Sequence, residues 1–423
     1  MTYNNPNING SNWSELNILE SLRKKNPLVI CITNDVVRTF TANGLLAIGA
    51  SPVMSECSED LKDLIVHASA LLINIGTLTP EKVGYYKKAI KLAKKYDVPI
   101  ILDPVGCHAG AYRLSVVLDL IKTGSISLLR GNQSEVKAVY DALSSDNKDE
   151  NSPLGKGVDG AQVPDSAIIA YRLARLINCP VVATGEEDYV SDGTRVFAVP
   201  HGHSIMTAVT GTGCLLGAVL AAFFGIYDSF KDSLSTGEFL AYALAYYGLA
   251  GESAVKVSGI KPGSFSIAFM DALYTLDDEV LVSENRVQSI VVPDQLQVYF
   301  VCGTQDTELN KKRLLEIVED ACRGGITCFQ FREKGDGTLE GQQKLELAQQ
   351  LQHICAKYHV LYIINDDVEL AVAVNADGVH VGQDDMCLED VRNIVGHKVV
   401  GISIHSIEEL HKTDVLYADC VGV

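Results

Sequence analysis

The sequence predicts a two-domain α/β protein, and three observations support this class. The chain has 423 residues, more than one typical domain holds. Short apolar runs that suit buried strands alternate with longer amphipathic segments, as in layered folds with a mostly parallel sheet. This alternation pauses near residues 281–295 and then restarts. We therefore expect a first domain over residues 1–280, a linker over 281–295 and a second domain over 296–423.

The first domain is expected to be built from strands and helices in alternation. Its candidate strands are Leu28–Ile32, Ala70–Ile75, Pro99–Leu102, Ile126–Leu129 and Val181–Thr184. Helices are expected over Pro80–Tyr96, Ser166–Leu176 and Gly237–Val257, and a tightly packed helix over 211–225 behind a glycine turn. The polar, glycine-rich stretch 145–162 is expected to be an exposed loop.

The second domain is expected to be an incomplete TIM-type (β/α) barrel, with about six of eight strands. Six short apolar runs are separated by helical stretches, and this order is typical of such barrels. The runs cover residues 298–302, 326–331, 360–364, 378–381, 399–402 and 419–423.

Composition excludes several classes of function. A net charge of −18 argues against a nucleic-acid partner, because DNA and RNA binders need a basic face. No apolar run is long enough for a transmembrane helix, and the polar N-terminus lacks the features of a secretory signal. The eleven cysteines form no Cys-x-x-Cys pair and suit buried free thiols, so we expect a cytoplasmic protein.

The run Thr210–Cys214 precedes a strongly helical stretch. Glycines at such a point let backbone N–H groups converge on one spot, which suits a phosphate or a developing anion. Cys214 falls in the first helical turn, where a thiol pKa is typically lowered. Its thiolate could accept a proton from a substrate hydroxyl that attacks ATP. The alternative is that Gly211 and Gly213 only allow close helix packing.

Three charged residues follow candidate strands, at the sheet edge where ligands usually bind. Asp103 could hold Mg²⁺ through water, Arg130 could neutralise phosphate charge, and Glu135 could order water on Mg²⁺. A purely structural alternative exists for each. Asp103 also suits the start of a turn before Pro104, and Arg130 and Glu135 suit a helix start with an acidic first turn.

Six motifs in one order resemble hydroxyethylthiazole kinases. They are CITNDVV with Asn34, GASPVM with Met54, LDPVG, LRGNQSE, ATGE with Thr184, and TGTGC, and the resemblance runs from about Ser21 to Leu276. It implies a ribokinase-like, three-layer α/β/α domain. It also implies that ATP and Mg²⁺ serve to phosphorylate 4-methyl-5-(2-hydroxyethyl)thiazole in thiamine biosynthesis or salvage. Another vitamin-precursor alcohol, such as hydroxymethylpyrimidine, is the alternative substrate.

The resemblance also implies a role for each matching residue, and a homotrimer with the thiazole pocket at a subunit boundary. Cys214 takes the place of the aspartate base of related kinases, and Gly213 lies at the anion site beside it. Asn34, Met54 and Gly211 match thiazole-pocket positions, Arg130 and Thr184 match ATP contacts, and Asp103 and Glu135 match the metal region.

Polar residues also follow the candidate strands of the second domain. Gln330, Arg332 and Lys334 could bind a pyrophosphate, or they could form a solvated charge cluster. Asp366 and Asp385 follow successive strands, so both should reach the same mouth of the barrel. Two carboxylates there suit Mg²⁺ bridged to a diphosphate.

The motifs QFREK, IIND, DGVHVGQDD and GISIH resemble thiamine-phosphate synthase from about Val298 to Val423. This enzyme joins hydroxymethylpyrimidine diphosphate to thiazole phosphate. The resemblance implies that the diphosphate substrate is held by Gln330, Arg332, Lys334, Asn365 and Ser403, and Mg²⁺ by Asp366 and Asp385.

The family pattern departs from this chain in two places. It continues beyond 419–423 into a loop and two more βα units, and FVCGTQD stands where a Thr-Asp pair is usual. We therefore expect a longer version to be bifunctional and the chain as given to make little thiamine phosphate. The alternative is a non-catalytic binding or assembly module.

Overall fold

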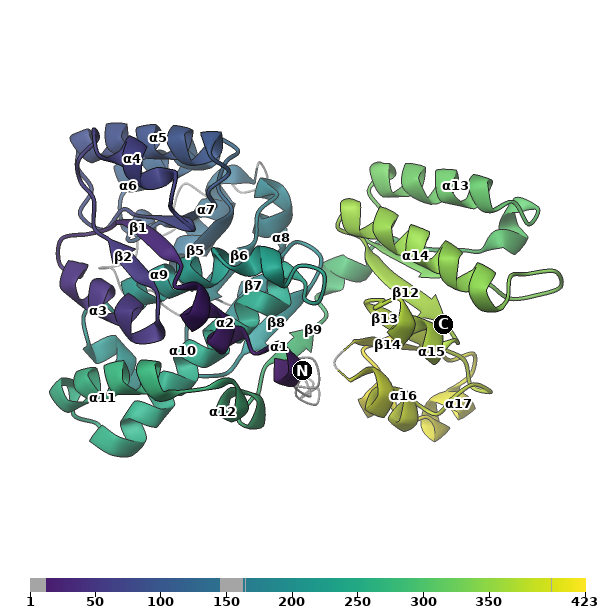
Figure 1. Cartoon of the computed structure of the whole chain (residues 1–423). Coiled ribbons are helices and arrows are strands. Elements are labelled where there is room, and N and C mark those ends of the chain that lie inside the picture. Colours follow the sequence, from purple (N-terminus) through teal and green to yellow (C-terminus); the bar gives the residue numbers. More distant parts are fainter. Residues whose placement is uncertain (1–12, 145–162, 164, 397) are drawn as a thin grey trace. The chain divides into compact units, whose positions relative to one another are not determined.

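The computed structural model describes residues 13–144, 163, 165–396 and 398–423, which form two compact units (Figure 1). The larger unit runs to Val287 and the smaller one starts at Gln288, inside the stretch expected as a linker. The expected loop over 145–162 lies outside the described residues. Among those that are described, no helix combines the length and apolar character needed to cross a bilayer.

The larger unit is built on one sheet, in which its strands have the order β2-β1-β3-β4-β5-β6-β7-β8. Pairing is parallel from β2 to β6 and antiparallel from β6 to β8. Its strands are β1 (Leu28–Ile32), β2 (Ser51–Val53), β3 (Ala70–Asn74), β4 (Ile100–Asp103), β5 (Leu128–Asn132), β6 (Val181–Thr184), β7 (Asp188–Ser191) and β8 (Val196–Val199). Strand β9 (Gln288–Ile290) belongs to the smaller unit.

Helices cover both faces of this sheet, which gives the expected three layers (Figure 1). One face packs against α4 (Leu61–Ile65), α5 (Pro80–Lys95), α6 (Ala111–Ile121), α7 (Gln133–Leu143) and α8 (Ser166–Ile177). The other contacts α9 (Thr212–Phe224) and α10 (Thr236–Ser258). The remaining helices are α1 (Trp13–Leu16), α2 (Ile18–Lys25), α3 (Arg38–Ile48), α11 (Pro262–Thr275) and α12 (Asp278–Ser283).

Helix α9 is the element that carries the glycine run, and its sequence explains its position. From Leu215 to Phe223 every residue is buried, so the helix is apolar on all sides and lies inside the unit. Gly211 precedes it with φ 99°, in the left-handed region that favours glycine. A Cβ at this residue would lie 3.0 Å from Val37 Cγ1. The turn into the helix therefore needs glycine, as expected.

The smaller unit contains six parallel strands in chain order, β10 to β15, which form an incomplete TIM-type barrel as predicted. The strands are β10 (Tyr299–Cys302), β11 (Cys328–Phe331), β12 (Leu361–Asn365), β13 (Gly378–Val381), β14 (Val399–Ser403) and β15 (Cys420–Gly422). The helices between them are α13 (Lys311–Gly324), α14 (Gly341–Lys357), α15 (Val368–Ala373), α16 (Leu388–Val395) and α17 (Ile407–Lys412).

Alternating residues of these strands serve two separate cores. Phe329, Phe331 and Tyr362 belong to the core beneath the helices, whereas Cys328 and Leu361 belong to a second core on the opposite face. Because side chains alternate along a strand, the last inner-face positions are free to carry polar groups. These positions hold Gln330, Asn365, His380 and Ser403.

Candidate active site

Four parallel strands bring four of the predicted kinase residues to one edge of the sheet. Asp103 ends β4, Thr184 ends β6, and Arg130 lies in β5. Asn34 follows β1 by two residues. Since the carboxyl ends of parallel strands meet at one edge, residues far apart in the sequence become neighbours. Helix α9 contacts β1, β3 and β4, so its first turn reaches the same edge.

Hydrogen bonds and an ion pair connect these side chains. Asn34 Nδ2 donates to Cys214 Sγ over 3.2 Å, and Arg130 Nη2 donates to Thr184 Oγ1 over 2.9 Å. Arg130 Nη1 lies 3.6 Å from Asp103 Oδ2, with both side chains buried. The structure therefore brings together Asn34 and Cys214 from the predicted thiazole side, and Asp103, Arg130 and Thr184 from the predicted ATP and metal side.

The guanidinium of Arg130 lies beside the start of α9. A Cβ at Gly213 would be 3.6 Å from Arg130 Nη2, so the helix N-terminus and the cation face the same small region. Free backbone N–H groups, the helix dipole and a buried guanidinium all stabilise negative charge. This arrangement can hold a phosphate group and the negative charge that develops during its transfer.

The expectation of a lowered thiol pKa at Cys214 is wrong. Burial, together with the nearby Asp103 carboxylate, raises the pKa of Cys214 to about 11. Hydrogen bonds from Asn74 and Asn34 and the charge of Arg130 act in the opposite direction but do not compensate. The helix start is outweighed here because desolvation disfavours the thiolate more than the dipole favours it. At neutral pH the group is a thiol.

Asp103 and Glu135, the predicted metal residues, lie in different surroundings. Asp103 is fully buried, and burial raises its pKa to about 7 although Arg130 lowers it. Its Oδ1 has no hydrogen-bond partner among the described residues. The two oxygens of Glu135 accept the N–H groups of Gly106 and Asn132, each over 2.7 Å. Asp103 can thus offer an oxygen toward water on Mg²⁺. Glu135 instead caps the start of α7 and binds the loop that contains Gly106.

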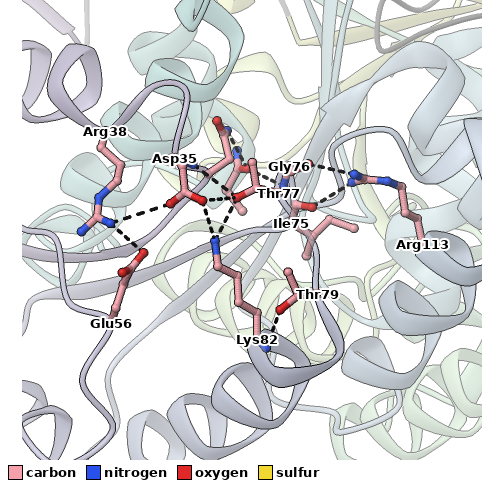
Figure 2. Close-up of polar contacts among 11 residues, drawn as sticks. Asp35, Arg38, Glu56, Ile75, Gly76, Thr77, Thr79, Lys82 and Arg113 are labelled. Carbon is pink, nitrogen blue, oxygen red and sulfur yellow. Dashed lines mark hydrogen bonds and ion pairs between the residues drawn. The ribbon is translucent and has the colours of Figure 1, made fainter.

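Met54 lies at the rim rather than in this network. It follows β2, is half-buried, and its carbonyl oxygen accepts from Arg38 Nη2 over 3.4 Å. Figure 2 shows the surrounding polar contacts, in which Arg38 contacts Asp35 and Glu56 while Lys82 reaches Asp35. These exposed pairs link the loops after β1 and β2 to the start of α5. No hydrogen bond joins Met54 to Cys214 within the described part of the chain.

The predicted diphosphate residues of the smaller unit gather at the carboxyl ends of its strands. Gln330 is buried and donates to the Tyr299 hydroxyl over 3.2 Å. Ser403 Oγ lies 2.9 Å from His380 Nε2. Asn365 is paired in register with His380 across β12 and β13. Arg332 follows β11 and is exposed, and Lys334 lies two residues further on.

Asp366, Asp385 and Lys334 form a compact charged group at the same edge. Lys334 Nζ lies 2.8 Å from Asp366 Oδ2. Burial raises the pKa of Asp366, and the adjoining Asp385 carboxylate raises it further. Burial also opposes ionisation of Asp385, but the Gly382 N–H and Asp366 outweigh it and lower its pKa. Two carboxylates held together against their repulsion form a site that a divalent cation would stabilise.

This carboxylate pair fits Mg²⁺ bound together with a diphosphate. In the part of the chain that the structure describes, no group of three or more His, Cys, Asp or Glu side chains could hold a metal alone. Mg²⁺ commonly uses one or two carboxylates, with water and substrate phosphates completing its shell. Asp366 and Asp385 suit that mode, and Lys334 could neutralise the remaining phosphate charge.

Residues 19–279 match the family model described as the hydroxyethylthiazole kinase family, and this match covers more than half of the chain. The chain belongs to the hydroxyethylthiazole kinase family. Residues 298–423 match a second family model, described as thiamine monophosphate synthase. Both resemblances drawn from the sequence are confirmed.

Relatives of the kinase family match over nearly their whole length. Hydroxyethylthiazole kinase of Streptococcus agalactiae serotype Ia is 50% identical over 267 residues, which are 63% of this chain and 99% of that protein. Hydroxyethylthiazole kinase 1 of Streptococcus pneumoniae is 44% identical over 272 residues, 64% of this chain and 99% of that protein. The hydroxyethylthiazole kinase structure from Pyrococcus horikoshii is 34% identical, with a TM-score of 0.57, and covers 65% of this chain and 98% of that chain.

Two polar residues on strands, Asn74 and His380, lie at the candidate sites but are not among the predicted site residues. Asn74 ends β3 in ALLIN, and its position matches that of Asp103 at the end of IILD. His380 lies two residues after Gly378 in GVHV, on the inner face that also carries Asn365. A rule that examines each polar residue at the end of a buried strand would have found both.

Proposed function

We propose that the larger unit transfers the γ-phosphoryl group of ATP to the hydroxyl of hydroxyethylthiazole. The observation that carries this proposal is the position of Arg130, whose guanidinium lies beside the first turn of α9 and donates to Thr184. Family membership supplies the alcohol substrate. Hydroxymethylpyrimidine is the competing acceptor.

In this proposal the residues act mainly by position and charge. Arg130 and the N–H groups before Cys214 stabilise the phosphoryl group in flight, as such groups do in other kinases. Asn34 and Met54 hold the thiazole, and Gly211 lets the chain turn close to it. Asp103 orders water on Mg²⁺, which when bound neutralises charge on the ATP phosphates. The free thiols of the protein suit the proposed cytoplasmic location.

The test is a product assay with both acceptors. Purified protein, ATP and Mg²⁺ are incubated with hydroxyethylthiazole or hydroxymethylpyrimidine, and mass spectrometry detects the phosphorylated alcohol. Thiazole phosphate should form at least about tenfold faster than pyrimidine phosphate, a ratio within reach of pocket discrimination. Arg130→Met should abolish both reactions, whereas Arg323→Met, which changes an exposed arginine of the smaller unit, should not. Equal rates on both alcohols would reject the thiazole assignment.

We also propose a homotrimer through the larger unit. Support comes from α3 and α11, which pack together and carry exposed apolar side chains. Leu46 is 59% exposed and Ile267 is 70% exposed, and such groups are commonly buried in assemblies. Light scattering on the full chain should give three times the monomer mass. The Ile267→Asp variant should give a lower mass, because a charge at this position opposes association. A monomeric wild-type protein would reject this assembly.

For the smaller unit we propose binding of hydroxymethylpyrimidine diphosphate with Mg²⁺. Lys334, Asp366 and Asp385 provide the charges, and Gln330 and Ser403 lie on the inner face nearby. Isothermal titration calorimetry should detect binding of the diphosphate only when Mg²⁺ is present. Asp366→Asn should weaken binding about tenfold to a hundredfold, and the exposed Asp384→Asn should not. Metal-independent binding would contradict the carboxylate role.

A further inference from the structure

Asn74 is the one polar residue of strand β3, and it lies at the centre of the candidate kinase site. Its exposure is 0%, and it ends the strand that lies between β1 and β4. In the register of the sheet it is directly opposite Asp103. No motif used to assign the site includes it. A buried amide in this position must have its hydrogen bonds satisfied or it destabilises the fold.

Apart from its hydrogen bond to Cys214, the side chain of Asn74 makes three hydrogen bonds. Its Oδ1 accepts from Asn34 Nδ2 over 3.1 Å and from the Gly76 N–H over 3.0 Å. Its Nδ2 donates to Asp103 Oδ2 over 2.7 Å. The Gly76 N–H can only donate, so it fixes which end of the amide is the oxygen, and the nitrogen then points to the carboxylate. The position thus requires a group that accepts on one side and donates on the other.

Both partners of Asn74 reach further into the site. Asn34 uses the same Nδ2 to contact Cys214 Sγ, and Asp103 forms the ion pair with Arg130, which contacts Thr184. Asn74 therefore connects the side of the site assigned to the thiazole with the side assigned to ATP and metal. Without it, Asn34 would keep only its contact with Cys214 and Asp103 only its ion pair with Arg130, so each would lose a buried hydrogen bond that orients it.

We propose that Asn74 is a positioning residue for phosphoryl transfer, which holds Asn34 and Asp103 in register across the two halves of the site. This inference rests on the proposed kinase function. Small displacements of groups that orient reactants lower rates strongly, and loss of a supporting hydrogen-bond partner typically costs about tenfold to a hundredfold in activity. Asn74 itself touches neither substrate nor ATP in this assignment.

The variant Asn74→Asp tests this role with almost no change in volume. It keeps the acceptor toward Asn34 and Gly76 but replaces the donor toward Asp103 with a second carboxylate. We expect kcat with hydroxyethylthiazole to fall about tenfold to a hundredfold. The KM for ATP should stay within about twofold, because the contact between Arg130 and Thr184 is not changed directly.

The matched control is Asn285→Asp, the same chemical change at another buried asparagine of the larger unit. Asn285 Oδ1 accepts from the Val287 N–H, and an aspartate can keep this bond. A purely structural effect of a buried carboxylate should lower the unfolding temperature in both variants and leave kcat per folded molecule unchanged. Kinetics are therefore measured well below the unfolding temperature and normalised to folded protein by circular dichroism.

Three outcomes decide the matter. A selective loss of kcat in Asn74→Asp supports the inference. If the wild type is active and the kcat of Asn74→Asp is within about twofold of it, the inference is overturned and the kinase function stands. The same conclusion follows if Asn285→Asp loses as much kcat as Asn74→Asp. A wild type that phosphorylates neither hydroxyethylthiazole nor hydroxymethylpyrimidine overturns the proposed function and the inference together.

Discussion

At the scale of single residues, Cys214 shows how burial can override a local motif. The sequence places a thiol in the first turn of a glycine-entered helix, and this position alone favours the thiolate. The folded chain surrounds it with apolar groups and a buried carboxylate, and its pKa rises to about 11. The motif correctly predicts where the residue lies, but its protonation depends on neighbours from β3 and β4 that the motif does not contain.

Replacement of Cys214 by alanine should lower kcat without weakening ATP binding. Because the group is a protonated thiol at neutral pH, the loss should be below about a hundredfold, the low end for a general base. The KM for ATP should change by less than about twofold. Cys214→Ser keeps a group that can accept from Asn34 and should recover part of the loss. Unchanged turnover in Cys214→Ala would show that Cys214 contributes nothing to phosphoryl transfer.

The buried carboxylate of Asp103 makes a prediction about pH and stability. Burial raises the pKa of Asp103 from 3.8 to about 7 in the folded protein. Between these values the folded state holds a proton that the unfolded chain has released. The stability that this bound proton contributes is fully present below pH 3.8 and is lost as the pH rises through about 7. Because Asp103→Asn has no such titration, its stability relative to wild type should increase with pH.

Urea unfolding in Mg²⁺-free buffer at pH 4.5 and pH 7.5 checks this expectation. The difference in unfolding free energy between Asp103→Asn and wild type should shift by at least about 1 kcal/mol in favour of the variant at the higher pH. Other groups with raised pKa values, such as Asp188, cancel in this difference. A difference independent of pH would show that Asp103 stays ionised in the folded protein.

At the scale of elements, the sequence was most informative where the pattern was regular. The five central strands from β1 to β6 and the helices α5, α8 and α10 were expected within a few residues of their bounds. Strands β7 and β8 were not, because each has four residues and they are joined by the turn that contains Asp192 and Gly193. Their antiparallel pairing extends the sheet beyond what a βα rhythm can predict.

The glycine turn before α9 provides a prediction at this scale. Gly211→Ala forces a Cβ into a left-handed turn, 3.0 Å from Val37 and 3.2 Å from Phe40. The free energy of unfolding should fall by about 1–3 kcal/mol, and thiazole phosphorylation should fall with it. The control is Gly84→Ala in α5, where a Cβ meets no atom within 4 Å. That variant should gain up to about 1 kcal/mol, since alanine favours helix.

Chemical denaturation of both variants measures these changes, and phosphorylation assays accompany them. Equal stability of Gly211→Ala and wild type would mean that the turn can adopt another conformation. In that case the requirement for glycine at the start of α9 would have to come from the substrate alone.

At the scale of the whole molecule, the boundary between the two units is the point where the sequence was least informative. The pause in the alternation of strands and helices at 281–295 predicts a linker, yet Leu281 is 1% exposed and Val287 is 0% exposed. Arg286 donates from its backbone N–H to His201 Nε2 over 3.1 Å, and its guanidinium pairs with Glu252. Charged and polar residues usually indicate a solvated segment, and only tertiary partners reveal that these are anchored.

Two truncated chains should therefore differ in stability. Residues 1–287 keep these anchors, and the protein should phosphorylate hydroxyethylthiazole with a kcat within about twofold of the full chain. Residues 1–280 lack Leu281, Arg286 and Val287. In the folded chain, His201, the Gly202 N–H and Arg286 together outweigh burial and hold the pKa of Glu252 at about 2. Removal of Arg286 takes away one of these three partners. Together these losses should lower the free energy of unfolding by about 2–4 kcal/mol, or Tm by roughly 5–15 °C.

Calorimetry of the two truncated proteins measures this difference in Tm. If both unfold at the same temperature as the larger unit of the full chain, residues 281–287 would be a true linker, and the anchoring contacts of Arg286 would contribute nothing to the stability of the kinase unit.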